Sequence, residues 1–160
     1  MTKPAIVLDI DETSLSNWPA YRANGWSRIT GGPCDLERGP CGIRAWQATG
    51  ASKALPATPP VWRSAPGAGR RRFFHHRPAA DLREAAENLR REGYEIYGVV
   101  LQPPGVTFKS AVDFKAPERR KIAEQGYTII LSMGDQDRDL RGGYAERTVA
   151  RSPTPSYPAD

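Results

Sequence analysis

Three short apolar runs, each followed by polar or turn-forming residues, constrain the fold of this chain most strongly. The first is the four-residue run 5–8 (Ala-Ile-Val-Leu), which ends at Asp9, and the others lie within 94–101 and 127–131. Short continuous runs rich in branched residues are typical of strands that a parallel sheet buries on both faces. We therefore predict three strands of one parallel sheet.

Two amphipathic segments alternate with these strands. In 79–92 the apolar residues recur at helical spacing and Gly93 follows, while 117–125 begins with proline and is followed by Gly126. Proline in a first turn and glycine after a last turn are typical of helix ends. Since strands and helices alternate, the sequence predicts an α/β fold with a parallel sheet flanked by helices.

The segment 17–60 differs from the rest of the chain. Glycine and proline residues interrupt it repeatedly, and it contains one short helical pattern at 42–48. The full length of 160 residues suits one domain with a substantial core. We therefore predict a single domain, 1–160, in which 17–60 is a small irregular insert over the functional edge of the sheet.

The charge balance of the chain bears on its partners. A net charge of +5 is compatible with a nucleic-acid partner, but the arginines at 70–72 account for much of it. Elsewhere Arg and Lys alternate with Glu and Asp, which is typical of a solvated surface, so we expect no nucleic-acid partner. No apolar run approaches the ~18 residues that a membrane span needs, so we expect no membrane partner.

An acidic segment, Asp-Ile-Asp-Glu-Thr at 9–13, directly follows the first predicted strand. Open parallel sheets bind ligands at the carboxyl ends of their strands. There the Asp9 carboxylate could attack phosphorus and form an aspartyl-phosphate, and Asp11 could act as acid and then as base. Two such carboxylates also favour a divalent cation. The alternative is an acidic turn without catalytic function.

A second acidic segment, Gly-Asp-Gln-Asp-Arg-Asp at 134–139, follows the third predicted strand. Asp135 could complete an oxygen-rich Mg²⁺ site, and Asp139, one helical turn further on, could support it. Lys115 precedes the second predicted helix, where it could neutralise a phosphoryl oxygen and keep the attacking carboxylate ionised. Taken alone, Asp135 could instead be a helix cap and Lys115 an exposed surface residue.

Three segments carry a family resemblance: DIDETSLSN at 9–17, FKAPERRKIAEQGY at 114–127 and GDQDRDLRGGYAERT at 134–148. They resemble the haloacid dehalogenase (HAD) superfamily, and within it the class B and plant-type acid phosphatases of subfamily IIIB, the group that includes vegetative storage proteins. The resemblance extends over roughly 4–155. It implies a three-layer Rossmann-like core and Mg²⁺-dependent hydrolysis of small phosphate monoesters.

The same resemblance implies roles for individual residues. Asp9 would be the nucleophile, Asp11 the general acid and base, and Thr13 a supporting hydrogen-bond donor. Lys115 would be the lysine on the phosphate side. The residues that would hold the Mg²⁺ are Asp9, Asp11 through its backbone carbonyl, and Asp135, with Asp139 in support.

One motif of these phosphatases is missing. They carry a strand that ends in Ser/Thr-Gly-Arg-Pro, whose hydroxyl and backbone N–H groups hold the phosphate. Here the segment at 70–78 reads RRRFFHHRP, and His76 stands where the resemblance places the threonine. We expect this segment to be a poor strand to bury, because its three arginines would enter the core of the sheet without partners.

A shift of reading frame would restore the missing motif. GC-rich codons for this region, read one base out of frame, yield a sequence like ARALGVAVFSITGRP, so we hypothesise that about 66–79 lies between two compensating single-base changes. A nucleotide sequence without that alternative reading would remove the hypothesis. If the chain carries the segment as written, activity should be weak or absent. The alternative function is then a catalytically impaired relative, either a storage or binding protein or a damaged gene product.

The two cysteines are informative about the compartment in which the protein functions. Cys34 and Cys41 lie in a turn-rich loop and could close a small disulfide loop in an oxidising compartment. Because enzymes of this kind are usually secreted, the resemblance implies the disulfide and an extracellular location. Related secreted phosphatases carry a signal and helical residues ahead of the first strand, so we expect the start of this chain to be shortened relative to theirs. The sequence leaves the oligomeric state open.

Overall fold

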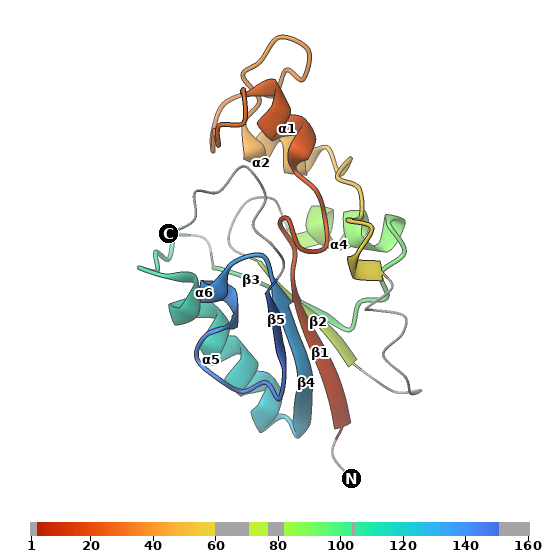
Figure 1. The fold of residues 1–160 in the computed structure, drawn as a ribbon, viewed down its shortest axis with the longest axis vertical. Helices are drawn as coiled ribbons and strands as arrows, with labels where there is room; N and C mark the ends of the chain where they lie inside the picture. Colours follow the sequence, from red (N-terminus) through yellow and green to blue (C-terminus); the bar gives the residue numbers. More distant parts are fainter. Residues whose placement is uncertain (1–2, 60–70, 77–81, 104, 151–160) are drawn as a thin grey trace.

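The structure is a computed structural model that describes residues 3–59, 71–76, 82–103 and 105–150. In this part of the chain five strands form one sheet in the order β3-β2-β1-β4-β5 (Figure 1). Their bounds are β1 Lys3–Asp9, β2 Arg71–His76, β3 Gly98–Leu101, β4 Tyr127–Gly134 and β5 Thr148–Ala150. Every neighbouring pair is parallel, so all carboxyl ends lie at the same edge of the sheet. The predicted parallel α/β fold is confirmed.

Helices cover both faces of this sheet. Their bounds are α1 Trp18–Ala23, α2 Ile43–Ala48, α4 Leu82–Arg91, α5 Ala111–Glu124 and α6 Asp137–Leu140. On one face Ile122 of α5 packs against Val7 of β1, and on the other face Leu89 of α4 packs with Leu8. Since successive strand residues point to opposite faces, α5 and α4 form the two outer layers of a three-layer core.

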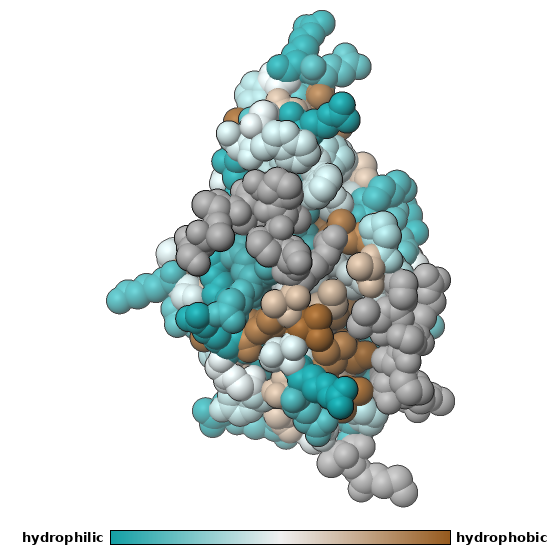
Figure 2. All heavy atoms as spheres, in the orientation of Figure 1, coloured by the Kyte–Doolittle hydropathy of each residue, from teal (hydrophilic) through white to brown (hydrophobic). Residues whose placement is uncertain are grey.

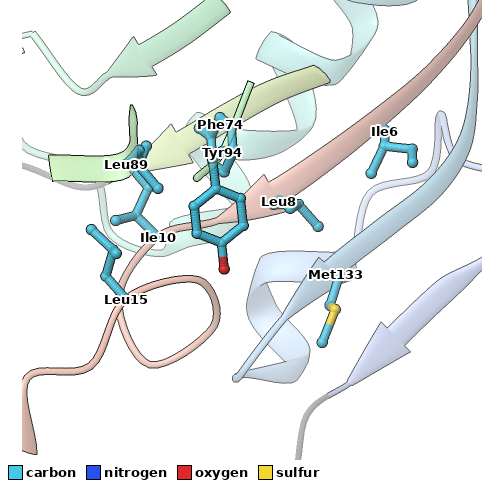
Figure 3. Packing of buried hydrophobic residues seen from close by; sticks show 8 residues of the cluster. All are labelled: Ile6, Leu8, Ile10, Leu15, Phe74, Leu89, Tyr94 and Met133. Carbon is cyan, nitrogen blue, oxygen red and sulfur yellow. The ribbon is translucent and has the colours of Figure 1, made fainter. Parts of the chain in front are cut away.

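The larger hydrophobic core lies between α4 and the sheet (Figure 3). Its buried members are Ile6, Leu8, Ile10, Leu15, Phe74, Leu89, Tyr94 and Met133. The ring of Tyr94 packs edge-on against Phe74, with 5.6 Å between centroids. Its hydroxyl donates to the carbonyl of Ser14 at 3.0 Å, so this core also fixes the loop that follows β1.

The expectation that 70–78 would make a poor strand is wrong for the described part of that segment. β2 pairs with β1 on one side and with β3 on the other. Its residues Phe73, Phe74 and His75 are buried, and two aromatic side chains supply the apolar area that a central strand needs.

The arginines of β2 lie at its amino end instead of in the core. Arg71 is exposed, and its guanidinium lies 4.3 Å from the ring centre of Tyr97. Arg72 forms an ion pair with Glu95. Both cations therefore have partners at the sheet edge remote from the carboxyl ends. Arg70 and the rest of 66–79 outside β2 lie beyond the described residues.

Helix α5 begins six residues before the predicted start. The Ser110 side chain accepts the N–H of Val112, and the Asp113 side chain accepts the N–H of Ser110 at 3.0 Å, which together form a capping box. The sequence prediction gave too much weight to Pro117, which lies inside α5. As a result Lys115 is within the helix and not ahead of it.

Strand β3 is shorter than the predicted run 94–101. The N–H of Tyr94 donates to the carbonyl of Leu89 at 3.0 Å, and the N–H of Tyr97 donates to the carbonyl of Arg72. The first bond turns the chain after α4, and the second joins it to β2 just before it enters the sheet at Gly98, so only the second half of the run is a strand.

The segment after β1 extends beyond the carboxyl end of that strand (Figure 1). It carries the predicted short helix as α2, and a further helix, α1, that was not predicted. Cys34 and Cys41 are joined by a disulfide, as the resemblance implied. The surface of this region is mostly hydrophilic, while apolar surface gathers near the middle of the same view (Figure 2). Among the described helices none has the length and apolar character needed to cross a bilayer.

Candidate active site

The site begins at the carboxyl end of β1, where a tight turn folds back on the strand. The carbonyl of Ile10 accepts the N–H groups of Thr13, Ser14 and Leu15 at 3.4, 2.9 and 2.9 Å. This turn returns two hydroxyls to Asp9. Thr13 Oγ1 lies 3.4 Å from Asp9 Oδ2, and Ser14 Oγ donates to the Asp9 carbonyl at 2.7 Å. The turn therefore fixes both the backbone and the carboxylate of Asp9.

Lys115 connects the ends of three elements. Helix α5 directs this side chain at the sheet edge, where only 4% of it is exposed. Its Nζ donates to Asp9 Oδ1 on β1 and, at 2.7 Å, to Asp139 Oδ1 on α6. One buried cation thus faces two buried carboxyl groups.

A third carboxylate comes from the end of β4. Ligand atoms of Asp9, Asp135 and Asp139 all lie within 4.8 Å of one another. Gly134 permits this approach, because a Cβ at that position would lie 2.6 Å from the Cβ of Asp139. Asp139 is also held by the N–H of Gln136, which donates to its Oδ2 at 3.1 Å.

Burial and crowding change the acidity of these groups. Burial raises the pKa of Asp9 to about 7 against the opposing charge of Lys115, and Asp139 adds to the rise. Burial, together with the charges of Asp9 and Asp139, raises the pKa of Asp135 to about 9. Burial alone would lower the pKa of Lys115, but the two facing carboxylates outweigh it and raise that pKa. Asp9 and Asp135 therefore hold protons that a cation would displace.

The donor set fits a hard divalent cation. Asp135 Oδ2 is buried and has no hydrogen-bond partner among the described residues, which is costly unless a ligand satisfies it. The neighbouring donors are carboxylate oxygens, the ligands that Mg²⁺ prefers. Asp139 already holds Lys115 and the Gln136 N–H with its two oxygens, which suits a supporting position better than a direct ligand.

Asp11 lies apart from this carboxylate cluster. Its Oδ1 accepts Asn17 Nδ2 at 2.9 Å and Gln47 Nε2 at 2.7 Å. It is still near enough for its charge to contribute to the raised pKa of Asp9. Of the residues predicted from sequence, the structure therefore brings together Asp9, Thr13, Lys115, Asp135 and Asp139, and it directs the Asp11 carboxylate towards the insert.

Sequence reasoning missed Arg119, which organises the loop after α6. This buried guanidinium donates to the carbonyls of Asp139 at 2.7 Å, Gly143 at 3.0 Å and Leu140 at 3.4 Å, and also to that of Arg141. Arg119 follows Lys115 by four residues, so both lie on one face of α5. That spacing would have been a usable signal if the helix had been predicted from its true start.

Sequence reasoning also missed the environment of His75. The register of β1 and β2 places His75 beside Asp9, and the histidine is only 1% exposed. Neither ring nitrogen has a hydrogen-bond partner among the described residues. Burial, with the charges of Lys115 and Arg119, lowers the pKa of His75 to about 3, so the ring stays neutral. The side chain of His76 lies outside what the structure describes.

The comparison with known families agrees with this geometry. The family described as HAD superfamily, subfamily IIIB (Acid phosphatase) matches residues 1–160. The chain belongs to this family.

Two plant proteins are similar to this chain. The "Stem 28 kDa glycoprotein" of Glycine max is 29% identical over 159 residues, which is 97% of this chain and 60% of that protein. "Acid phosphatase 1" of Solanum lycopersicum is 24% identical over 153 residues, 94% of this chain and 57% of that protein. The chain therefore spans about three fifths of the length of these HAD relatives.

A solved structure gives the same fold. The class C acid phosphatase from Bacillus anthracis, determined with tungstate bound, has a TM-score of 0.60 and 25% sequence identity. The match includes 89% of this chain and 55% of that one. The parallel sheet and its flanking helices are thus an HAD-type core.

Proposed function

We propose that this chain hydrolyses small phosphate monoesters with Asp9 as the nucleophile. The observation that carries the proposal is the buried Asp9 carboxylate at the end of β1, held by Lys115 and within 4.8 Å of Asp135 from β4. Membership of the acid phosphatase family and the likeness to a class C acid phosphatase support it.

Four residues of this chain would each have a separate role in the reaction. An Asp9 oxygen forms the bond to phosphorus while the ester oxygen leaves with a proton from Asp11. Water then gives a proton to Asp11 and attacks phosphorus, and the electron pair of the broken P–O bond returns to Asp9. Thr13 keeps the nucleophile oriented, and Lys115 offsets charge on the transferring phosphoryl group.

We propose Mg²⁺ as the cofactor of this site. The Asp9 and Asp135 carboxylates and the Asp11 carbonyl would hold it, and Asp139 would support them through Lys115 and the Gln136 N–H. When bound, such an ion would neutralise phosphate charge and orient the ester. The unpartnered Asp135 Oδ2 is the structural reason to expect it.

We propose that 1–160 forms one domain and functions in an oxidising compartment outside the cytosol. The Cys34–Cys41 disulfide supports that location, because such bonds persist mainly in secreted and extracellular proteins. We propose no nucleic-acid or membrane partner.

A second candidate function is favoured by one observation at β2. The end of that strand presents His75, a buried ring without partners, beside the nucleophile. A catalytically impaired relative with a storage or binding role would lack such a site, and the phosphate-holding hydroxyl that the resemblance places in 70–78 is missing.

One assay separates the two candidates. The chain is incubated with Mg²⁺ and p-nitrophenyl phosphate, and Asp9→Asn is the matched control because it removes the nucleophile and preserves side-chain volume. Turnover by the wild type that falls at least ~10³-fold in Asp9→Asn supports the enzyme. Equal background rates for the two proteins support the impaired relative.

A further inference from the structure

The insert contacts the candidate general acid through two side-chain amides. Asn17, at the cap of α1, donates from Nδ2 to Asp11 Oδ1 at 2.9 Å. Gln47, on α2 and 36 residues away in sequence from Asp11, donates from Nε2 to the same oxygen at 2.7 Å. Both donors come from the segment that follows the turn after β1, and neither comes from the sheet.

The position of Gln47 leaves one of its polar atoms unsatisfied. Its Oε1 is buried without a hydrogen-bond partner among the described residues. A buried acceptor without a hydrogen bond destabilises the folded protein. Turning the amide over would not remove the conflict, because its oxygen would then face the carboxylate oxygen of Asp11. The Gln47 side chain keeps this position although its Oε1 destabilises the fold. The hydrogen bond from its Nε2 to Asp11 explains the position better than stability does.

The two amide donors on Asp11 Oδ1 limit where this carboxyl group can hold a proton. An amide N–H can only donate, so Asp11 Oδ1 is occupied as an acceptor in both protonation states. A proton on Asp11 therefore does not lie between Oδ1 and either amide. The paired bonds also restrict rotation of the carboxyl group, which matters because proton transfer needs a heavy-atom separation of about 2.6–3.2 Å.

We propose that Asn17 and Gln47 are positioning residues that aim Asp11 at the leaving-group oxygen, so that the insert controls the general acid. This inference rests on the proposed phosphatase function and deepens it. In the first step the bond between Asp9 and phosphorus forms, the bond from phosphorus to the ester oxygen breaks, and the Asp11 proton moves to that oxygen. Without the two amides, Asp11 would be correctly aimed for a smaller fraction of the time.

The test compares two leaving groups, because only a poor leaving group needs the acid. p-Nitrophenolate leaves without a proton, whereas the alkoxide of glycerol 2-phosphate does not. In Gln47→Met, which keeps the length of the side chain, kcat/KM for glycerol 2-phosphate should fall about 10- to 100-fold, a part of the effect of a general acid. For p-nitrophenyl phosphate kcat/KM should fall less than about 3-fold, because kcat/KM reports transfer to Asp9 and not the later step in which Asp11 acts as base. Asn17→Ala should shift the ratio of the two rates in the same direction.

A matched control removes a buried amide that does not touch Asp11. Asn88 donates from Nδ2 to the carbonyl of Ser52 at 2.7 Å and lines the same small cavity as Gln47. Asn88→Ala should lower stability without changing the ratio of the two rates. Asp11→Asn marks the full effect, and adding Gln47→Met to it should change the ratio no further.

The outcomes separate this inference from the proposed function. Wild type that hydrolyses both esters, with a Gln47→Met variant that loses both rates equally or neither, overturns the positioning role and leaves the phosphatase intact. Wild type that hydrolyses neither ester overturns both proposals. If Gln47→Met does not fold, Asn17→Ala alone decides by the same ratio.

Discussion

The carboxyl ends of β1 and β4 differ sharply from the carboxyl end of β2. Beside the first two, charged groups face one another: Lys115 donates to Asp9 and Asp139, the turn after β1 returns a hydroxyl to Asp9, and Asp135 Oδ2 is left for a cation. At the third, His75 is buried with two nitrogens that no described group satisfies. All three ends belong to neighbouring strands of one sheet.

This contrast shows that forming a strand and equipping it for chemistry are separate requirements. β2 pairs on both sides and buries two phenylalanines, so backbone bonds and apolar area are sufficient to keep it in the sheet. The polar partners that a phosphate site needs depend on particular side chains at the strand end. A chain can therefore keep the HAD core while one of its strand ends is poorly suited to bind phosphate.

Replacing Lys115, which pairs with Asp9 at the carboxyl end of β1, should have the largest effect. Lys115→Met leaves the buried carboxylates of Asp9 and Asp139 facing each other, so we expect unfolding free energy to fall by about 3–5 kcal/mol. Turnover of p-nitrophenyl phosphate should fall at least ~10³-fold. Lys121→Met is the control on the same helix, since that side chain is 62% exposed and should change stability by less than about 0.5 kcal/mol. Similar urea midpoints for the two variants would contradict the role of Lys115.

Disturbing the loop beside Asp139 should have the next largest effect. Gly142 has φ of +93°, and a Cβ there would lie 2.4 Å from the Cβ of Ala116, so Gly142→Ala combines backbone strain with a collision. We expect a loss of about 2–4 kcal/mol in urea unfolding. Gly126→Ala, with φ of +84° and open space around it, should lose only about 1 kcal/mol. Equal losses would show that the contact with α5 does not matter.

Replacing His75 at the carboxyl end of β2 should raise the stability of the protein. His75→Val removes two unsatisfied nitrogens, and we expect stability to rise by about 1–3 kcal/mol at neutral pH. The folded-state pKa is about 3 and the unfolded value is 6.5, so the unfolded chain binds the extra proton between them. The wild type should therefore lose stability as pH falls from 6.5 towards 3, by on the order of 1 kcal/mol per pH unit. A variant with the same acid sensitivity as the wild type would refute this account of the β2 end.

Binding a divalent cation should have a smaller effect that depends on pH. The raised pKa values of Asp9 and Asp135, about 7 and about 9, mean that their contribution to stability is present at low pH and is lost as pH rises through those values. A cation displaces these protons, so stabilisation by Mg²⁺ should increase between about pH 5 and about pH 8. At tenfold excess over Kd it should reach about 1.4 kcal/mol in thermal unfolding. Asp135→Asn should abolish the increase, and an increase that persists would place the cation elsewhere.

Much of the fold could be predicted because it depends on local patterns. The apolar runs at 5–8 and 127–131 and the amphipathic segment 79–92 gave β1, β4 and α4 at nearly the observed places. The acidic segments at two strand ends could be predicted to meet, because parallel strands share one carboxyl edge. The capping box of α5 was overlooked in favour of a proline, so the start of that helix was wrong.

The rest depends on contacts between distant residues, which a single sequence does not display. The Asp11 carboxylate bonds with Gln47, an amide from an irregular segment without a readable pattern. Arg119 donates to backbone carbonyl groups, which every residue type has, so the sequence of the loop does not reveal these contacts. The strand β2 looked unsuitable because its arginines were assumed to enter the core, whereas register places them at the amino end.

The most direct test of the central proposal is to trap the phosphorylated enzyme. The wild type is mixed with excess p-nitrophenyl phosphate and Mg²⁺, quenched in acid during the first turnover, and digested for mass spectrometry. We predict one phosphoryl group on the peptide that contains Asp9, and none in the same peptide of Asp9→Asn. Turnover without that label, or a phosphoryl group on any other residue, would contradict attack by Asp9.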